Sequence, residues 1–325
     1  MALSTLISIA LAAGVVLQGA PPRPATEANQ AFNAWLRTPN EIPKVPAKIV
    51  RREYSWLDAT PAITMRDGVR YRDPTIAPWS FSINASIDEA RASAIERHFG
   101  APLDAIQFSY TSEEEKRKLQ RLENAKLAHH GMRVVPSSDG SFGMLEPDYA
   151  WLIETCRASI APVAQAVLTE TDRVLRAHRV GRLISTRDKV EAIFRFIQSI
   201  PYERIDDLPD GRDRCGMRTP LTTLLKGGDC DSKSALMAAL IRSKSIADVV
   251  IVTLKAKDGS GHALLGVRVD ARAGEQFVEY RGAKYVLAEA ASDDARRDGN
   301  LAELGEVGPD WRDFRSRPYE ITPVR

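Results

Sequence analysis

The chain has 325 residues, of which 44% are hydrophobic and 27% charged, a composition that excludes disorder over most of its length. Lys and Arg number 45 against 43 Asp and Glu, giving a net charge of +2. Because duplex nucleic acid is bound through a clustered basic excess, this balance argues against a nucleic-acid partner. The length suggests about two domains.

The first 20 residues carry no charged side chain and contain an apolar run from Leu6 to Leu17, followed by Gly19 and Ala20. Such a run followed by small residues is typical of a secretory signal peptide over residues 1–20. An uncleaved anchor is the alternative, since the run approaches the ~20 apolar residues of a spanning helix without reaching them. We therefore expect a periplasmic or secreted protein with no stable membrane span after signal cleavage.

Residues 21–45 are rich in Pro, Ala and Asn and are expected to form a linker. Residues 46–180 follow as an N-terminal α+β region whose role the sequence does not indicate. Alternation around Asp67-Gly68 predicts a β-hairpin there. Further elements are expected as a strand over 79–83 and as helices over 87–99, 111–130 and 147–178.

The hydrophobic pattern changes near Val180, and residues 181–325 are expected to form a second, catalytic region. A helix over 185–200 ends at Pro201. Two glycines, at 227 and 228, then break the chain before another helix, so that Cys230 lies in its first turn. Free N–H groups and the helix dipole stabilise an anion at this position, which predicts a thiolate accessible near neutral pH.

Four strands are expected after the Cys230 helix, over 248–254, 261–269, 276–280 and 284–289. We expect a meandering antiparallel sheet packed against that helix, and therefore an α+β fold. His262 opens the second strand, where it can meet the helix start and accept the thiol proton. Glu289 is the best candidate for an acid that orients the imidazole, and Asp270 is the second.

Four stretches carry a resemblance to a known family: Phe196–Tyr202, Gly228–Leu236, Gly261–Val267 and Tyr285–Glu289. Over roughly residues 185–292 the chain resembles the transglutaminase-like cysteine peptidases, of the bacterial transglutaminase-like cysteine proteinase type. The resemblance implies a papain-like core, in which a helix bearing the nucleophile packs on an antiparallel sheet.

By the same resemblance, Cys230 matches the nucleophile, His262 the base, and Glu289 the position where the family commonly has Asp. Gln198 precedes the nucleophile as an oxyanion donor does in papain-like enzymes, so its amide is a candidate for that role. The alternative for Gln198 is an ordinary polar residue near a helix end.

These residues predict an exported cysteine hydrolase that cleaves amide or peptide bonds through a thioester, with a protein or peptide as substrate. Two alternatives remain open. An amine that outcompetes water makes the same site an acyl transferase that cross-links proteins, and a non-catalytic binding protein can share the fold.

No cofactor is expected, although calcium is an alternative because carboxylates are ligands that it prefers. The acidic residues concerned lie beside the nucleophile and in the preceding loop: Asp229, Asp231, Asp206, Asp207 and Asp210. Helix capping by Asp229 and solvated loop charges are the other interpretation.

Three cysteines are too few for a disulfide scaffold and lack the spacing of a zinc site. In an oxidising compartment Cys156 and Cys215 can pair and leave Cys230 free. The sequence does not decide whether they do.

Overall fold

The computed structural model describes residues 25–58, 63–66, 69–72, 78–103, 105–106, 108–136, 143–178, 184–205, 212–255, 261–291, 302–308, 311 and 313–324. The signal peptide expected over residues 1–20 lies outside them. The fold is mixed α+β with antiparallel sheets, as the sequence predicts. Within the described ranges, no helix combines the length and the apolar character needed to cross a bilayer.

The first half of the chain forms four helices and seven strands among the described residues. These are α1 (Ala25–Leu36), β1 (Ile49–Asp58), β2 (Ile63–Arg66), β3 (Val69–Arg72), β4 (Trp79–Asp88), α2 (Glu89–His98), β5 (Ala101–Pro102), α3 (Glu113–His129), β6 (Met132–Pro136), β7 (Gly143–Pro147) and α4 (Tyr149–His178). The predicted hairpin is present, since β2 pairs antiparallel with β3. Arg66 lies opposite Val69 and Ile63 opposite Arg72.

A helix occupies part of the range expected to be a linker. Over residues 25–36 the expectation of a linker is wrong, because Ala28, Phe32 and Trp35 recur at helical spacing and bury one face of α1. The ring of Phe32 packs on that of Phe108, 5.0 Å away between centroids. Three buried apolar side chains therefore outweigh the loop-like composition of this segment.

The second half begins with α5, which the sequence placed correctly. Its elements are α5 (Thr186–Ser199), β8 (Arg212–Asp213), α6 (Pro220–Lys226), α7 (Cys230–Ser243), β9 (Val249–Lys255), β10 (Gly261–Val267), β11 (Phe277–Tyr280), β12 (Ala283–Ala288), η3 (Phe314–Ser316) and β13 (Tyr319–Val324). A capping box between Ser185 and Asp188 begins α5, which satisfies N–H groups that a helix start leaves open.

Five antiparallel strands form one sheet in the order β11-β12-β10-β9-β13. This differs from a simple meander, because β12 rather than β11 lies beside β10. The residues of β12 from Tyr285 to Ala288 are all buried, whereas β11 keeps exposed positions and lies at the edge. The outer strand β13, which the sequence analysis did not predict, covers the other edge by pairing with β9.

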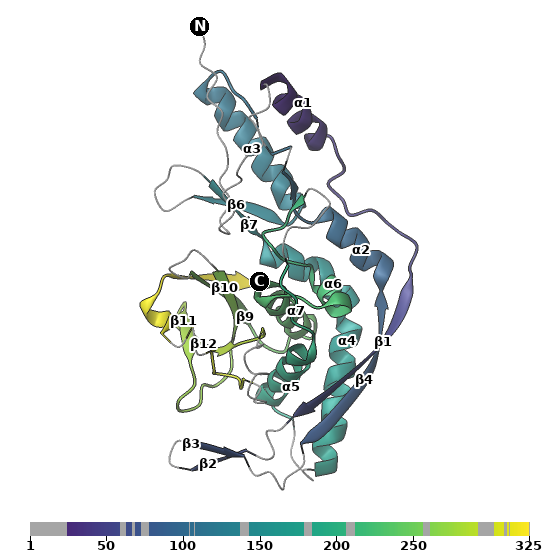
Figure 1. Cartoon of the computed structure of the whole chain (residues 1–325), viewed down its shortest axis with the longest axis vertical. Coiled ribbons are helices and arrows are strands. Elements are labelled where there is room, and N and C mark those ends of the chain that lie inside the picture. The colour runs from purple at the N-terminus through teal and green to yellow at the C-terminus, as the bar shows by residue number, and fades with distance from the viewer. Residues whose placement is uncertain are drawn as a thin grey trace.

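Helix α7 lies between this sheet and the long helix α4 (Figure 1). Every residue from Ser232 to Ile241 is buried, so α7 is covered on all sides rather than along one stripe. A helix enclosed in this way holds its first residue, Cys230, in a fixed place relative to the sheet.

One hydrophobic core runs through both halves of the chain. It includes Ile153 and Ile160 of α4 together with Phe194 of α5 and Leu236 of α7. Strand β5 of the first half also pairs with β8 of the second. The ranges 46–180 and 181–325 are therefore packed together and do not form separate cores on either side of residue 180.

The three cysteines are all free. Cys156 is fully buried in α4, and burial raises the pKa of its thiol to about 12. Cys215 donates a hydrogen bond to the carbonyl oxygen of Leu145 at 3.3 Å. The structure thus contains no Cys156–Cys215 pair.

Candidate active site

The start of α7 is a tight turn built on two glycines. Gly227 has φ of +87°, which favours glycine, and a Cβ on Gly228 would lie 2.6 Å from the Cβ of Ser232. Asp229 then caps α7, its carboxylate accepting from the N–H of Ser232 at 3.1 Å. The loop after α5 is tied to the same turn, because Gly228 donates to the carbonyl of Pro201 at 3.2 Å. This turn places Cys230 at the first helical position, as the sequence predicts.

The sulfur of Cys230 lies against strand β10. It accepts a hydrogen bond from the backbone N–H of Ala263, the residue after His262. Its thiol also lies 4.0 Å from Oδ1 of Asp231, within reach of a weak sulfur hydrogen bond. The helix start and the strand start therefore converge, and the convergence brings Cys230 next to the histidine strand.

His262 and Glu289 are joined by a short hydrogen bond. Nε2 of His262 lies 2.7 Å from Oε2 of Glu289, and both side chains are largely withdrawn from solvent, at 13% and 5% exposure. Glu289 directly follows β12, which pairs with β10, so neighbouring strands supply the two side chains. With Nε2 engaged, Nδ1 of His262 is the nitrogen left for a thiol proton.

Asp270, the second candidate for the acid, lies elsewhere. Strand β10 runs from Gly261 to Val267, so Asp270 follows its far end while His262 stands near its beginning. Asp270 is exposed, and its carbonyl oxygen accepts from Arg187 at 2.8 Å. The structure brings Glu289, and not Asp270, to the imidazole.

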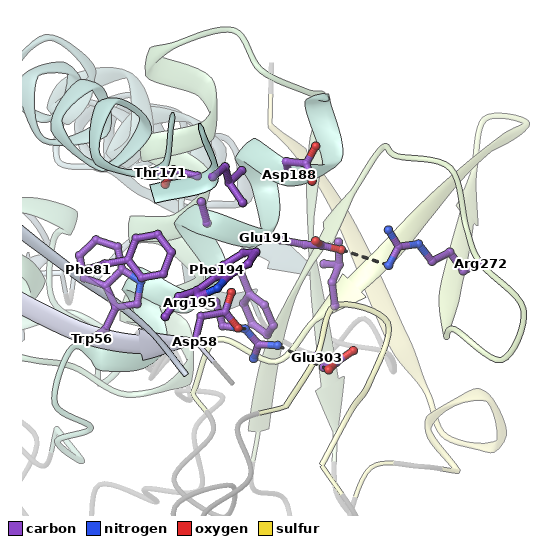
Figure 2. Close-up of a pocket in the computed structure, with 14 residues that line it drawn as sticks. Trp56, Asp58, Phe81, Thr171, Asp188, Glu191, Phe194, Arg195, Arg272 and Glu303 are labelled. Carbon is purple, nitrogen blue, oxygen red and sulfur yellow. Dashed lines mark ion pairs between the residues drawn. The ribbon is translucent and has the colours of Figure 1, made fainter. Parts of the chain in front are cut away.

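Gln198 is engaged away from Cys230. Its amide Nε2 donates to the carbonyl oxygen of Ala302 at 2.9 Å, and its Oε1 accepts from Arg195 at 3.0 Å. Arg195 in turn lies 3.7 Å from Asp58 and 3.8 Å from Glu303, beside a cavity of about 70 Å³ walled by aromatic and charged side chains (Figure 2). Gln198 is buried, and its described contacts link α5 to the loop around Ala302 rather than to the sulfur.

The pKa of His262 is set by burial and by two neighbouring carboxylates, Glu289 and Asp231. Burial lowers the pKa of His262, but the charge and hydrogen bond of Glu289 and the charge of Asp231 together outweigh it, so that the pKa lies above its usual value. The charge of Glu289 is therefore the main support for a protonated imidazole.

The expectation of a thiolate accessible near neutral pH is wrong for this structure. Burial, followed by the negative charges of Asp231 and Asp229, raises the pKa of the Cys230 thiol well above its usual value. The helix N-terminus is present, but two carboxylates within the same turn oppose it. Near neutral pH the protonated thiol is therefore the favoured form of Cys230.

Two residues near Cys230 and His262, namely Tyr149 and Trp311, are not indicated by the sequence. Tyr149, fully buried at the start of α4, donates a hydrogen bond to Asp231. Burial and the charge of Asp229 raise the pKa of Asp231 to about 7. The ring of Trp311 stacks on His262 at 4.9 Å between centroids. Asp231 is recognisable from the sequence because it directly follows Cys230, whereas no local pattern marks Tyr149 or Trp311.

Replacing Asp231 with asparagine is expected to speed alkylation of Cys230 by iodoacetamide. The substitution leaves Cys230 partly buried but removes the largest of the three charges that raise its pKa, and each pKa unit is worth about tenfold in thiolate population. The rate is measured at about pH 8, where the carboxyl of Asp231 is mostly ionised. Asp248→Asn, in the connection between α7 and β9, removes an exposed carboxylate as a control. Equal rates in the wild type and Asp231→Asn would show that this charge does not act on the thiol.

The described part of the chain contains no group of three or more His, Cys, Asp or Glu side chains arranged to hold a metal ion. Asp206, Asp207 and Asp210, which the calcium alternative includes, lie outside the described residues. Asp229 caps α7, which agrees with the other interpretation of that residue.

No family model, no curated protein and no solved structure matches the chain.

Proposed function

We propose that this protein is an exported cysteine hydrolase of the transglutaminase-like type, with a papain-like core, that cleaves amide bonds in proteins or peptides. One observation carries the proposal: Nε2 of His262 lies 2.7 Å from Glu289, and the backbone N–H of the following residue, Ala263, donates to the sulfur of Cys230. An imidazole placed between a thiol and a buried carboxylate is the arrangement used for nucleophilic acyl transfer.

The reaction begins from neutral His262, whose proton lies on Nε2 toward Glu289, so that Nδ1 can accept the proton of the Cys230 thiol. The sulfur attacks the amide carbonyl, and Glu289 supports the imidazolium that forms. The imidazolium then protonates the departing amine, the C–N bond breaks, and a thioester with Cys230 remains. Water, deprotonated by the same imidazole, attacks the thioester, which releases the carboxylate product and restores the thiol.

The oxyanion of the tetrahedral intermediate is assigned to the backbone N–H of Cys230 at the start of α7. The first N–H groups of a helix have no partner within it and carry the positive end of the dipole. The Gln198 amide already donates to Ala302, so the backbone N–H takes the role that the resemblance gave to Gln198.

The experiment that tests the proposal uses p-nitrophenyl acetate as an activated acyl donor. We expect a burst of p-nitrophenol followed by slower turnover, and an acetyl group that mass spectrometry maps to the peptide containing Cys230. Acetylation that is absent, or that falls on lysines alone, would contradict the proposal and favour a binding protein. Adding dansylcadaverine separates the two acceptors, since incorporation of the amine would identify an acyl transferase.

A further inference from the structure

The imidazole of His262 is covered by an aromatic ring that takes no part in the proposed bond changes. The rings of His262 and Trp311 are stacked, with centroids 4.9 Å apart and planes inclined by 13°. A single hydrogen bond from Nε2 to Glu289 fixes one atom of the imidazole but leaves its plane free to rotate about that contact. The flat face of Trp311 removes this freedom.

Trp311 is itself held in place by its own segment. Gly305 donates to the carbonyl of Leu287 in β12 at 2.7 Å, and Gln276 donates to the carbonyl of Gly305 at 2.8 Å. The N–H of Trp311 then donates to Gly308 at 2.9 Å, and the fully buried Phe314 anchors the following turn. The ring is therefore attached to the strand that precedes Glu289.

A cation lies over Trp311. The guanidinium of Arg317 is 5.0 Å from the centroid of the tryptophan ring, and its position is fixed by an ion pair of 2.7 Å with Asp313. Such a contact is attractive because the positive guanidinium faces the negative face of the indole ring. Arg317 thus holds the ring that orders the histidine.

We propose that Trp311 is a positioning residue, which fixes the plane of the His262 imidazole so that Nδ1 faces the sulfur of Cys230 while Nε2 stays on Glu289. Its face also stabilises the imidazolium, because a cation over an indole ring is attracted to the π electrons. The catalytic part of this inference rests on the proposed hydrolase function, whereas the ordering of the imidazole does not.

The test compares Trp311→Leu with Trp311→Phe in the full-length protein. Leucine keeps apolar bulk but offers no ring face, and phenylalanine keeps the face. His262 is followed by NMR of 13C-labelled histidine, which gives five ring signals, and is assigned by the loss of its signal in His262→Asn. Trp79→Leu is the matched control, since Trp79 stacks on a different histidine, His178, at 5.2 Å.

In Trp311→Leu we expect the His262 ring protons to lose their ring-current shift and the pKa of His262 to fall. The alkylation rate of Cys230 should fall about 10- to 100-fold, the usual cost of a misplaced catalytic group. Trp311→Phe should retain most of the shift and of the rate, and Trp79→Leu should change the signal of His178 alone.

The inference is overturned if Trp311→Leu leaves the shift, the pKa and the alkylation rate of His262 and Cys230 as in the wild type. It is also overturned if Trp311→Leu and Trp311→Phe lower these three quantities equally. A side chain that only fills space would not distinguish leucine from phenylalanine. The proposed hydrolase function fails separately, through the absence of an acyl group on Cys230, and the NMR comparison keeps its meaning in that case.

Discussion

Single replacement of Cys230 or His262 by alanine is expected to lower turnover of p-nitrophenyl acetate by at least about 10³-fold, and the double replacement to lower it no further. In the proposed mechanism the two side chains share one proton transfer and one attack, so removing either side chain prevents both steps. The raised pKa of the partly buried thiol makes the dependence on His262 stronger, because the thiol stays protonated near neutral pH unless a base removes its proton.

The measurement is the steady-state rate of the two single variants and of the double variant, with unfolding by urea as the control for an intact fold. His178→Ala is the matched control, because it removes a histidine that stacks on Trp79 in another part of the molecule. Additive losses in the double variant would mean that the cysteine and the histidine act separately, which contradicts the mechanism.

Replacing Glu289 with glutamine is expected to lower turnover by about 10²- to 10⁴-fold. Glutamine preserves the shape of the buried side chain but removes the charge that supports the imidazolium. It also replaces the carboxylate that accepts the hydrogen bond from Nε2 with a neutral amide. The pKa of His262 should fall, since the charge and hydrogen bond of Glu289 are the main causes that raise it against the effect of burial. The acidic limb of the pH–rate profile should therefore move to lower pH.

The same substitution has a pH-dependent effect on stability. Because the pKa of His262 is raised in the folded state, its pairing with Glu289 stabilises the fold fully below the unfolded pKa of about 6.5. This contribution is lost as the pH rises through the folded value. Glu289→Gln should thus cost more free energy of unfolding near pH 6 than near pH 9. Asp270→Asn is the control, and an equal cost at both pH values would show that the ion pair does not stabilise the fold.

Local sequence patterns were sufficient to predict the parts of the site that depend on neighbouring residues. Gly227 and Gly228 before an apolar helix placed Cys230 at a helix start, and β-branched runs placed His262 and Glu289 at the ends of strands. Each of these positions follows from propensity and from periodicity over a few residues.

The features that the sequence did not reveal depend on distant contacts. Gln198 lies on the buried face of α5, where Arg195 and Ala302 take up its amide, and no local pattern shows that the loop around Ala302 would be there. The pairing of β13 with β9 and the stacking of Trp311 on His262 join segments that are far apart in the chain. A helix start alone does not determine the thiol pKa of Cys230, because burial and the adjacent carboxylates raise that pKa and depend on how the chain folds.

Tyr149 gives the first half of the chain a direct part in the electrostatics around Cys230. It begins α4, yet its hydroxyl donates to Asp231, the residue after Cys230. A chimera that exchanged residues 46–180 for those of another protein would replace this donor together with the helix that supports α7. Grafting the Cys230 region alone onto a foreign partner would therefore move the thiol without the hydroxyl that donates to the neighbouring carboxylate.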